Sequence, residues 1–312
     1  MEFALTLLGT NGALPAYGRF PTAQWLQIHH QSYLIDCGEG TQMRIQDYQV
    51  KPGRLHSIFI SHLHGDHCFG LIGLLTSFNL TGRDKPLHIY SPPGLQGMIE
   101  AQLAPTGTEL QFTVHFHEVD PTIHTCIAED KLITVHTIPL DHRIPCCGYL
   151  FREKARERNI YPEKIQEYDL SVPQIVAAKA GEDVTLPDGR TIPVEELTTP
   201  PPPPRSYAFC SDTRYKPDII PLIKGVDLLY HESTFCREYT ERAAETGHST
   251  AAQAAQIARE ANVGKLILGH YSSRYPDVSV FALEAKSIFG ESHAGLDGQT
   301  YDIPFDGRRI DS

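Results

Sequence analysis

The sequence predicts an α/β protein in which β-sheets pack together and helices cover the outside. In the first half of the chain, short apolar runs end in polar, Gly-rich loops, as strands do. After about residue 205, apolar runs alternate with a segment of helical periodicity. With 312 residues and 41% apolar side chains, the chain can form one large domain or two modest ones.

The expected strands are short apolar runs, and they cover residues 3–8, 25–28, 33–35, 57–60, 87–90, 132–138, 207–210, 228–230 and 265–268. One helix has a clear start, because Thr250 and Gln253 have the spacing of a capping box. Alanines at i, i+3, i+4 and i+7 then mark one face of this helix, and we expect Gly264 to end it. An order of strands in the first part of the chain and of alternating strands and helices in the later part favours layered sheets with outer helices.

The charge balance excludes one class of function. Lys plus Arg is 27 and Asp plus Glu is 38, so the formal net charge is −11. A protein that coats nucleic acid non-specifically needs a basic surface to neutralise phosphates. This chain can therefore bind nucleic acid only through a local basic patch or at a metal site.

The sequence predicts a cytoplasmic protein with no membrane contact. No apolar run reaches the ~20 residues of a membrane helix. No basic region followed by a long apolar stretch marks a secretory signal at the start. The seven cysteines are scattered and form no CxxC pair, which is typical of reduced thiols.

Residues 151–204 differ in composition from the rest of the chain. They are polar and charged, and they close with five consecutive prolines, Pro200–Pro204, which favour a stiff spacer. We therefore expect three segments: 1–150 and 205–312 as two halves of one domain, and 151–204 as an inserted arm. On composition alone, this insertion could equally be a surface excursion with no role.

Histidines and aspartates with metal-ligand spacing follow one expected strand. His62, His64, Asp66 and His67 form an HxHxDH pattern directly after the run 57–60. Imidazole nitrogens and carboxylate oxygens are donors that zinc accepts. Gly65 permits the tight backbone that such crowding requires. The pattern therefore predicts a metal site rather than a surface histidine cluster.

Three further candidate ligands follow strands in the same way. They are His142, Asp212 and His270, after the runs 132–138, 207–210 and 265–268. Asp141 competes with His142 at its position, and we expect it to lie just outside the ligands. The remaining histidines without such context are expected to be surface or structural residues: His29, His30, His56, His88, His115, His117, His124, His136 and His293.

These patterns resemble the metallo-β-lactamase superfamily and, within it, the ribonuclease Z family of tRNA 3′-processing endonucleases. HxHxDH alone specifies only the superfamily. More specific are residues 33–41, which resemble the LxDCGEGTQ segment of the family, and 231–235, which resemble its HEAT-type motif. Residues 247–250, followed by the Ala-rich helix, resemble its HST motif. The resemblance implies an α/β (α+β) fold, the αββα sandwich of two mixed sheets with outer helices and a protruding arm.

The resemblance also implies two zinc ions per subunit, although manganese or iron suits the same donors. One ion takes His62, His64 and His142, the other takes Asp66, His67 and His270, and Asp212 bridges them. Two adjacent cations can hold a hydroxide, lower its proton affinity and clamp a phosphodiester for in-line attack. The expected reaction removes the 3′ trailer of precursor tRNA and leaves a 3′-hydroxyl on the tRNA.

The same resemblance gives roles to three catalytic residues. His248 is the candidate acid for the leaving 3′ oxygen, and Glu232 orients or tunes it. Without the resemblance, both could equally be local structural residues. Asp66 has a second possible role, which is to orient the attacking hydroxide.

Two stretches depart from the family pattern. The loop that usually contains a PxKxRN-like sequence reads PAYGRFP at 15–21, without its Lys and Asn, so recognition of the tRNA 3′ end and its CCA is open. The arm lacks the usual Gly-Pro element. The start of the arm is basic and could contact RNA phosphates, although Glu153 and Glu157 offset part of its positive charge. Its candidate RNA-binding residues are Arg152, Lys154, Arg156 and Arg158. A solvated charged helix is the alternative.

Two alternatives to a tRNA endonuclease therefore remain open. One is a related dinuclear phosphodiesterase that acts on small or cyclic nucleotide diesters, or on other RNA. The other is a metal-free scaffold protein, against which the full ligand set argues. The family resemblance further implies a homodimer in which the arm of one subunit grips RNA processed by the other.

Overall fold

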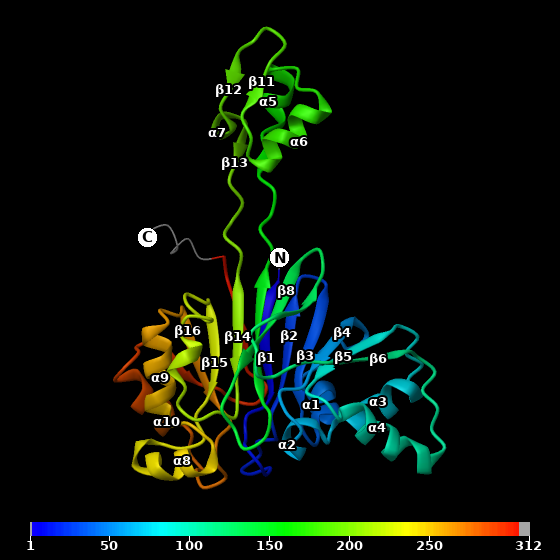
Figure 1. Cartoon of the computed structure of the whole chain (residues 1–312), viewed down its shortest axis with the longest axis vertical. Coiled ribbons are helices and arrows are strands. Elements are labelled where there is room, and N and C mark those ends of the chain that lie inside the picture. The colour runs from blue at the N-terminus through cyan, green and yellow to red at the C-terminus, as the bar shows by residue number, and fades with distance from the viewer. Residues whose placement is uncertain (1, 306–312) are drawn as a thin grey trace. The chain divides into compact units, whose positions relative to one another are not determined.

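The computed structural model describes residues 2–305, which form two compact units (Figure 1). The first unit contains the residues up to Arg152 together with Ser206–Ile303. The second unit is built from Glu153–Arg205, with Pro304 and Phe305. No helix within residues 2–305 has the length and apolar character needed to cross a membrane.

Two seven-stranded sheets form the frame of the first unit. The first sheet has the order β18-β1-β2-β3-β4-β5-β6. Its strands are β1 (Phe3–Gly9), β2 (Ala23–Ile28), β3 (Gln31–Cys37), β4 (Leu55–Phe59), β5 (Leu87–Ser91), β6 (Val114–Glu118) and β18 (Thr300–Asp302). Strands β1 to β3 pair antiparallel, whereas β3 to β6 run parallel, so the sheet is mixed.

The second sheet has the order β17-β16-β15-β14-β9-β8-β7. Its strands are β7 (Cys126–Glu129), β8 (Ile133–Pro139), β9 (Cys147–Glu153), β14 (Ser206–Cys210), β15 (Leu228–Glu232), β16 (Lys265–Gly269) and β17 (Ser292–Ala294). It is also mixed, since β14 to β17 run parallel and β9 pairs antiparallel with β14.

Alternation along the strands divides apolar side chains between an inner and an outer core. In β14, Tyr207 and Phe209 join a cluster with Phe59 from the first sheet, which fills the space between the sheets. Ala208 and Cys210 point the other way, into the cluster that packs under the helices. The layered arrangement expected from the sequence is therefore confirmed.

Helices cover the outer face of each sheet (Figure 1). The first sheet is covered by α1 (Thr41–Asp47), α3 (Leu71–Leu80) and α4 (Leu95–Leu103), and the second by α9 (Ala251–Glu260) and α10 (Ser279–Lys286). Shorter elements are α2 (Gly65–Cys68), α8 (Thr240–Thr246) and the 3₁₀ turns η1 (Pro52–Arg54), η2 (Ala104–Thr106), η3 (Pro217–Ile219) and η4 (Arg237–Tyr239).

The start of α9 is the one expected, and its end is not. Thr250 and Gln253 form the capping box in both directions. The helix ends at Glu260, four residues before Gly264, so that expectation was wrong. Asn262 adopts a positive φ of 50°, and asparagine in this conformation terminates helices as glycine does.

The second unit has a small core of its own. Its elements are β10 (Asn159–Ile160), α5 (Pro162–Glu167), α6 (Val172–Ala180), β11 (Val184–Thr185), β12 (Thr191–Ile192), α7 (Val194–Leu197) and β13 (Thr198–Thr199). Leu170, Ala178 and Leu197 are buried together in it. Residues 154–158 form no helix, so the alternative of a charged helix at the start of this segment was wrong.

Candidate metal centre

Four strand ends deliver the candidate ligands. His62 follows β4, and α2 begins three residues later and carries Asp66 and His67. His142, Asp212 and His270 follow β8, β14 and β16, respectively. β4 belongs to the first sheet and the other three strands to the second, so loops from both sheets meet at this site.

The structure brings all seven candidate ligands into two adjacent groups. Within each group, one potential ligand atom per residue lies within 4.8 Å of the others. The first group is His62, His64, His142 and Asp212, and the second is Asp66, His67 and His270.

Asp212 lies between the two groups and offers one carboxylate oxygen to each. Its Oδ2 lies 3.7 Å from Nε2 of His62 and 3.6 Å from Nε2 of His142. Its Oδ1 lies 3.2 Å from Nε2 of His67 and 3.1 Å from Nε2 of His270. This is the position that a bridging ligand needs.

The chemistry of these residues fits a divalent metal. The Nε2 atoms of His67 and His270 are buried without a hydrogen-bond partner among the described residues. Burial opposes ionisation of Asp212, but the surrounding histidines hold its pKa well below the usual range. Buried nitrogens and carboxylates that converge without enough partners of their own suit bound cations.

Hydrogen bonds from the opposite ring nitrogen fix three ligand histidines. Nδ1 of His67 donates to Oδ2 of Asp36 at 2.7 Å, and Nδ1 of His142 donates to the carbonyl oxygen of Gly247 at 2.8 Å. Nδ1 of His270 lies 2.9 Å from Oγ1 of Thr234. Such bonds hold each ring so that its Nε2 would face a bound metal ion.

Asp36 is a functional residue that the sequence analysis did not identify. It is fully buried, and it also accepts hydrogen bonds from the backbone N–H and the hydroxyl of Ser61. Its place after the apolar run 33–35 is the same strand-end signal that identified Asp212. Asp36 therefore holds His67 and, through Ser61, the start of the HxHxDH loop.

His248 lies beside both ligand groups. Its ring centroid is 5.1 Å from that of His142 and 5.2 Å from that of His270. Its Nδ1 lies 2.9 Å from Oε1 of the fully buried Glu232. Burial lowers the pKa of His248, but the Glu232 carboxylate outweighs this and raises it to about 9.

Glu232 is held by several donors. The backbone N–H of Thr213 donates to Oε1, while the N–H and hydroxyl of Thr234 donate to Oε2. Because Thr234 also contacts His270, Glu232 connects the candidate acid with a candidate metal ligand. Thr234 is a second residue that the sequence analysis did not single out.

The residues just before the altered stretch 15–21 lie against the second ligand group. The backbone N–H of Ala13 donates to Oδ2 of Asp66 at 2.7 Å. A Cβ at Gly12 would lie 2.6 Å from Cε1 of His270, so only glycine fits there. Arg19 is nearly buried, and its side chain bonds Asn11 and the carbonyl oxygens of Tyr275 and Pro276. The guanidinium of Arg19 therefore forms hydrogen bonds within the protein and does not point into solvent.

Asp141 does not take the position expected for it. Its carboxylate pairs with Arg214 at 3.0 Å and is half exposed. His142, the next residue, turns into the ligand group, so the expectation that Asp141 supports the ligands was wrong.

The structure places the four candidate RNA-binding cations on or just after β9. Arg152 lies within this strand, and Lys154 follows it. Arg156 contacts the carboxylate of Glu153 at 3.2 Å, and Nε of Arg158 donates to Oγ1 of Thr198 at 2.6 Å. Arg156 and Arg158 thus have polar partners within the second unit.

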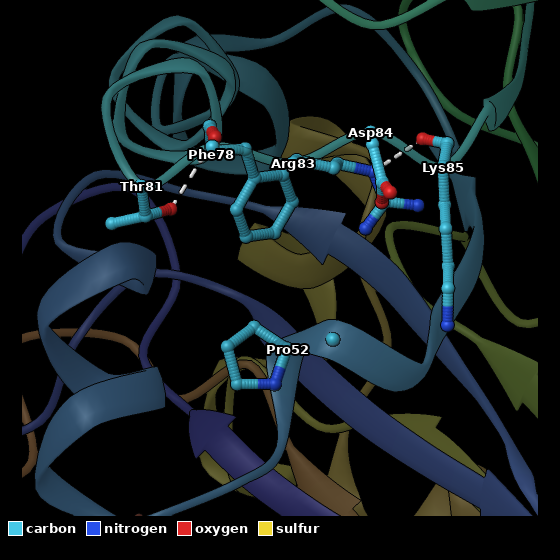
Figure 2. A pocket seen from close by; sticks show the side chains of 8 residues that line it. Pro52, Phe78, Thr81, Arg83, Asp84 and Lys85 are labelled. Carbon is cyan, nitrogen blue, oxygen red and sulfur yellow. Dashed lines mark hydrogen bonds between the residues drawn. The ribbon is translucent and has the colours of Figure 1, made fainter.

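A cavity of about 340 Å³ lies away from the metal centre (Figure 2). It borders the N-terminal ends of β4 and β5, whereas the candidate ligands follow C-terminal strand ends. Its Arg83 donates to the carbonyl oxygens of Leu55, Lys85 and Pro86. This guanidinium therefore supports the loop instead of facing a ligand.

Known proteins are similar to this chain in sequence and fold. A family model described as anti-Pycsar protein Apyc1 matches residues 3–157. The ribonuclease Z of Bacteroides thetaiotaomicron is 47% identical over 93% of this chain and 92% of its own length. The crystal structure of human tRNase Z, short form, matches with a TM-score of 0.72 and 27% identity, over 96% of this chain and 99% of that one.

The fold is also that of the metallo-β-lactamase fold protein YhfI from Bacillus subtilis. That structure matches with a TM-score of 0.65 and 20% identity, over 97% of this chain and all of that one. The αββα sandwich expected from the sequence is therefore confirmed. Because nearly half of its residues are shared with a relative along almost the whole of both chains, this protein belongs to the ribonuclease Z family.

Proposed function

We propose that this protein is a metal-dependent endoribonuclease that removes the 3′ trailer from precursor tRNA and leaves a 3′-hydroxyl. Membership of the ribonuclease Z family supports this proposal. The main structural observation in its favour is the position of Asp212 between two groups of candidate metal ligands. The acidic chain needs no general basic surface if a metal centre engages the scissile phosphate.

Seven residues would hold two metal ions. His62, His64 and His142 serve one ion, Asp66, His67 and His270 serve the other, and Asp212 serves both. Two such ions, when bound, lower the proton affinity of a water and offset the charge of the phosphodiester. We propose zinc, and the same donors suit manganese or iron.

His248 is the proposed acid. The leaving O3′ atom of the tRNA requires a proton, and a histidine whose pKa is raised to about 9 carries one at neutral pH. Glu232 binds Nδ1 of this ring, which directs Nε2 as the donor. Oδ2 of Asp66 accepts the Ala13 N–H, and the proposed second role of this carboxylate is to orient the attacking hydroxide.

The second unit is the proposed arm for precursor tRNA. Its buried cluster allows it to act as a small rigid body. Lys154 and Arg156 offer charge for RNA phosphates, together with Arg152 and Arg158. We also propose a homodimer, in which this unit of one subunit contacts RNA cleaved by the other.

We further propose a cytoplasmic location. All seven cysteines are free, and six of them are buried. Buried free thiols suit a reducing compartment.

A second candidate is a phosphodiesterase for small or cyclic nucleotide diesters. The observation that favours it is the altered loop, in which Arg19 is turned inward and the Lys and Asn of the family motif are absent. In this case the metal centre would keep its chemistry while recognition of the tRNA end would be lost.

The test is to incubate the purified protein with a 3′-extended precursor tRNA, with and without a chelator, and to map the new 3′ end. A single metal-dependent cut next to the discriminator base supports the tRNA-processing function. No cut, together with hydrolysis of bis(4-nitrophenyl) phosphate, would support the second candidate. Neither activity in the metal-loaded protein would contradict both.

A further inference from the structure

Four histidines outside the metal centre lie together at the edge of the first sheet. His56 is in β4, His88 is in β5, and His115 and His117 are in β6. In the order of this sheet, β6 is the edge strand. The sequence analysis treated all four as surface or structural residues.

Strand register places His88, His115 and His117 on one face. His88 is paired with His115, and Tyr90 with His117. Because side chains two residues apart on a strand share a face, His115 and His117 project from the same side of β6. The ring of His88 stacks on those of His56 and His115, at centroid distances of 5.4 and 4.8 Å.

Two imidazole nitrogens face each other within this cluster. Nδ1 of His88 lies 3.0 Å from Nε2 of His117, with 19° between the ring planes. Two nitrogens that share a tetrahedral zinc ion at about 2.0–2.1 Å are separated by about 3.3 Å. A small rotation of either ring would therefore make room for a metal ion between them.

The two nitrogens form a hydrogen bond with each other, which a bound metal ion would replace, and the surroundings favour the neutral form of both rings. Burial, followed by the neighbouring histidines, lowers the pKa of both His88 and His117, so both rings are neutral at pH 7. Neutral imidazole is the form that binds metals. Asp130 interacts electrostatically with His56 at the other end of the row, and its negative charge favours a cation there.

We propose that His88 and His117 bind an additional divalent transition-metal ion, with His115 turning from its stack on His88 to supply a third ligand. Imidazole ligands suit zinc, copper and nickel, and positions left open by the protein are filled by water. This site is separate from the ligands on the ends of β4, β8, β14 and β16. It does not depend on the proposed RNA cleavage.

The test is a nickel titration of the full-length, zinc-loaded protein at pH 7.5, with bound nickel and retained zinc both measured after dialysis. We expect one nickel ion per chain with no loss of zinc. His88→Gln and His117→Gln should each weaken nickel binding at least about tenfold, since even changes outside the ligand shell cost about 10–100-fold. The matched control is His30→Gln, an exposed histidine remote in sequence from this cluster.

Two outcomes would overturn the proposal. One is nickel uptake only at the expense of zinc, and the other is equal uptake by His88→Gln, His117→Gln and His30→Gln. His115→Gln changes an exposed side chain, so we expect it to fold and to test the site even if the other variants misfold. Unchanged nickel affinity in His115→Gln would remove His115 as a ligand, and retained hydrolysis of bis(4-nitrophenyl) phosphate would verify the catalytic centre of each variant.

Discussion

Nδ1 of His248 lies 2.9 Å from Oε1 of Glu232, a carboxylate with no exposure to solvent. This contact orients the His248 ring, and it places a negative charge next to the candidate acid. It also predicts how the reaction depends on pH.

Glu232→Gln should shift the alkaline limb of the pH–rate profile to lower pH. The protonated form of His248 is the active one, so activity falls as pH rises through its pKa, which Glu232 raises to about 9. Removing the carboxylate charge lowers that pKa, and activity is lost earlier. The measurement is kcat between pH 6 and pH 10, and an unshifted limb would count against this role of Glu232. Glu245→Gln, which changes an exposed carboxylate paired with Arg242, should leave the profile unchanged.

Asp212→Asn should reduce the metal content and abolish turnover. Its two oxygens face different ligand groups, so one substitution affects both ions. Elemental analysis should find two metal ions in the wild-type protein and one or fewer in the variant. Asp141→Asn is the matched control, since its carboxylate pairs with Arg214 instead. If Asp212→Asn kept both ions at full affinity, the bridging position would be wrong.

Asp36→Asn should weaken metal binding by about 10–100-fold while leaving the ligands themselves in place. The carboxylate accepts the Nδ1–H of His67 and two bonds from Ser61. The asparagine amide can replace only part of this set. Competition with a chromophoric chelator measures the change, and circular dichroism verifies folding. Wild-type affinity in a folded Asp36→Asn protein would show that His67 needs no such support.

Lys154→Gln combined with Arg156→Gln should raise KM for precursor tRNA and leave hydrolysis of bis(4-nitrophenyl) phosphate unchanged. Phosphate contacts contribute to affinity in a salt-dependent way, so the difference from wild type should shrink at high salt. Arg190→Gln in the same unit, where Arg190 pairs with Asp188, is the control. Equal losses on both substrates would indicate misfolding, and no loss on either would remove these cations from RNA binding.

The fold was predictable because its signals are local. Apolar runs, strand-end loops and the Thr250 capping box each occupy a few consecutive residues. The side-chain directions in the loop after β8 could not be predicted in the same way. Whether Asp141 or His142 faces the ligands depends on how the loop after β8 turns, and adjacent residues give no sequence signal for that.

The supporting residues were harder to predict than the candidate ligands. In the sequence, Asp36 follows the apolar run 33–35 as Asp212 follows the run 207–210, but an aspartate after such a run is also common as a turn former. Only the fold brings it within 2.7 Å of His67, which is 31 positions away in the sequence. The end of α9 was missed for a related reason, because Asn262 competed with Gly264 as the terminating residue.

The most direct test uses precursor tRNA in which the O3′ atom of the scissile phosphodiester is replaced by sulfur. A thiolate leaves without a proton, so an enzyme that lacks its acid should recover on this substrate. His248→Ala should cleave the normal substrate about 10²–10⁴-fold more slowly than wild type. With the sulfur substrate, the account predicts nearly equal single-turnover rates for the variant and the wild type. An equal defect on both substrates would contradict the assignment of His248 as the acid for the leaving oxygen.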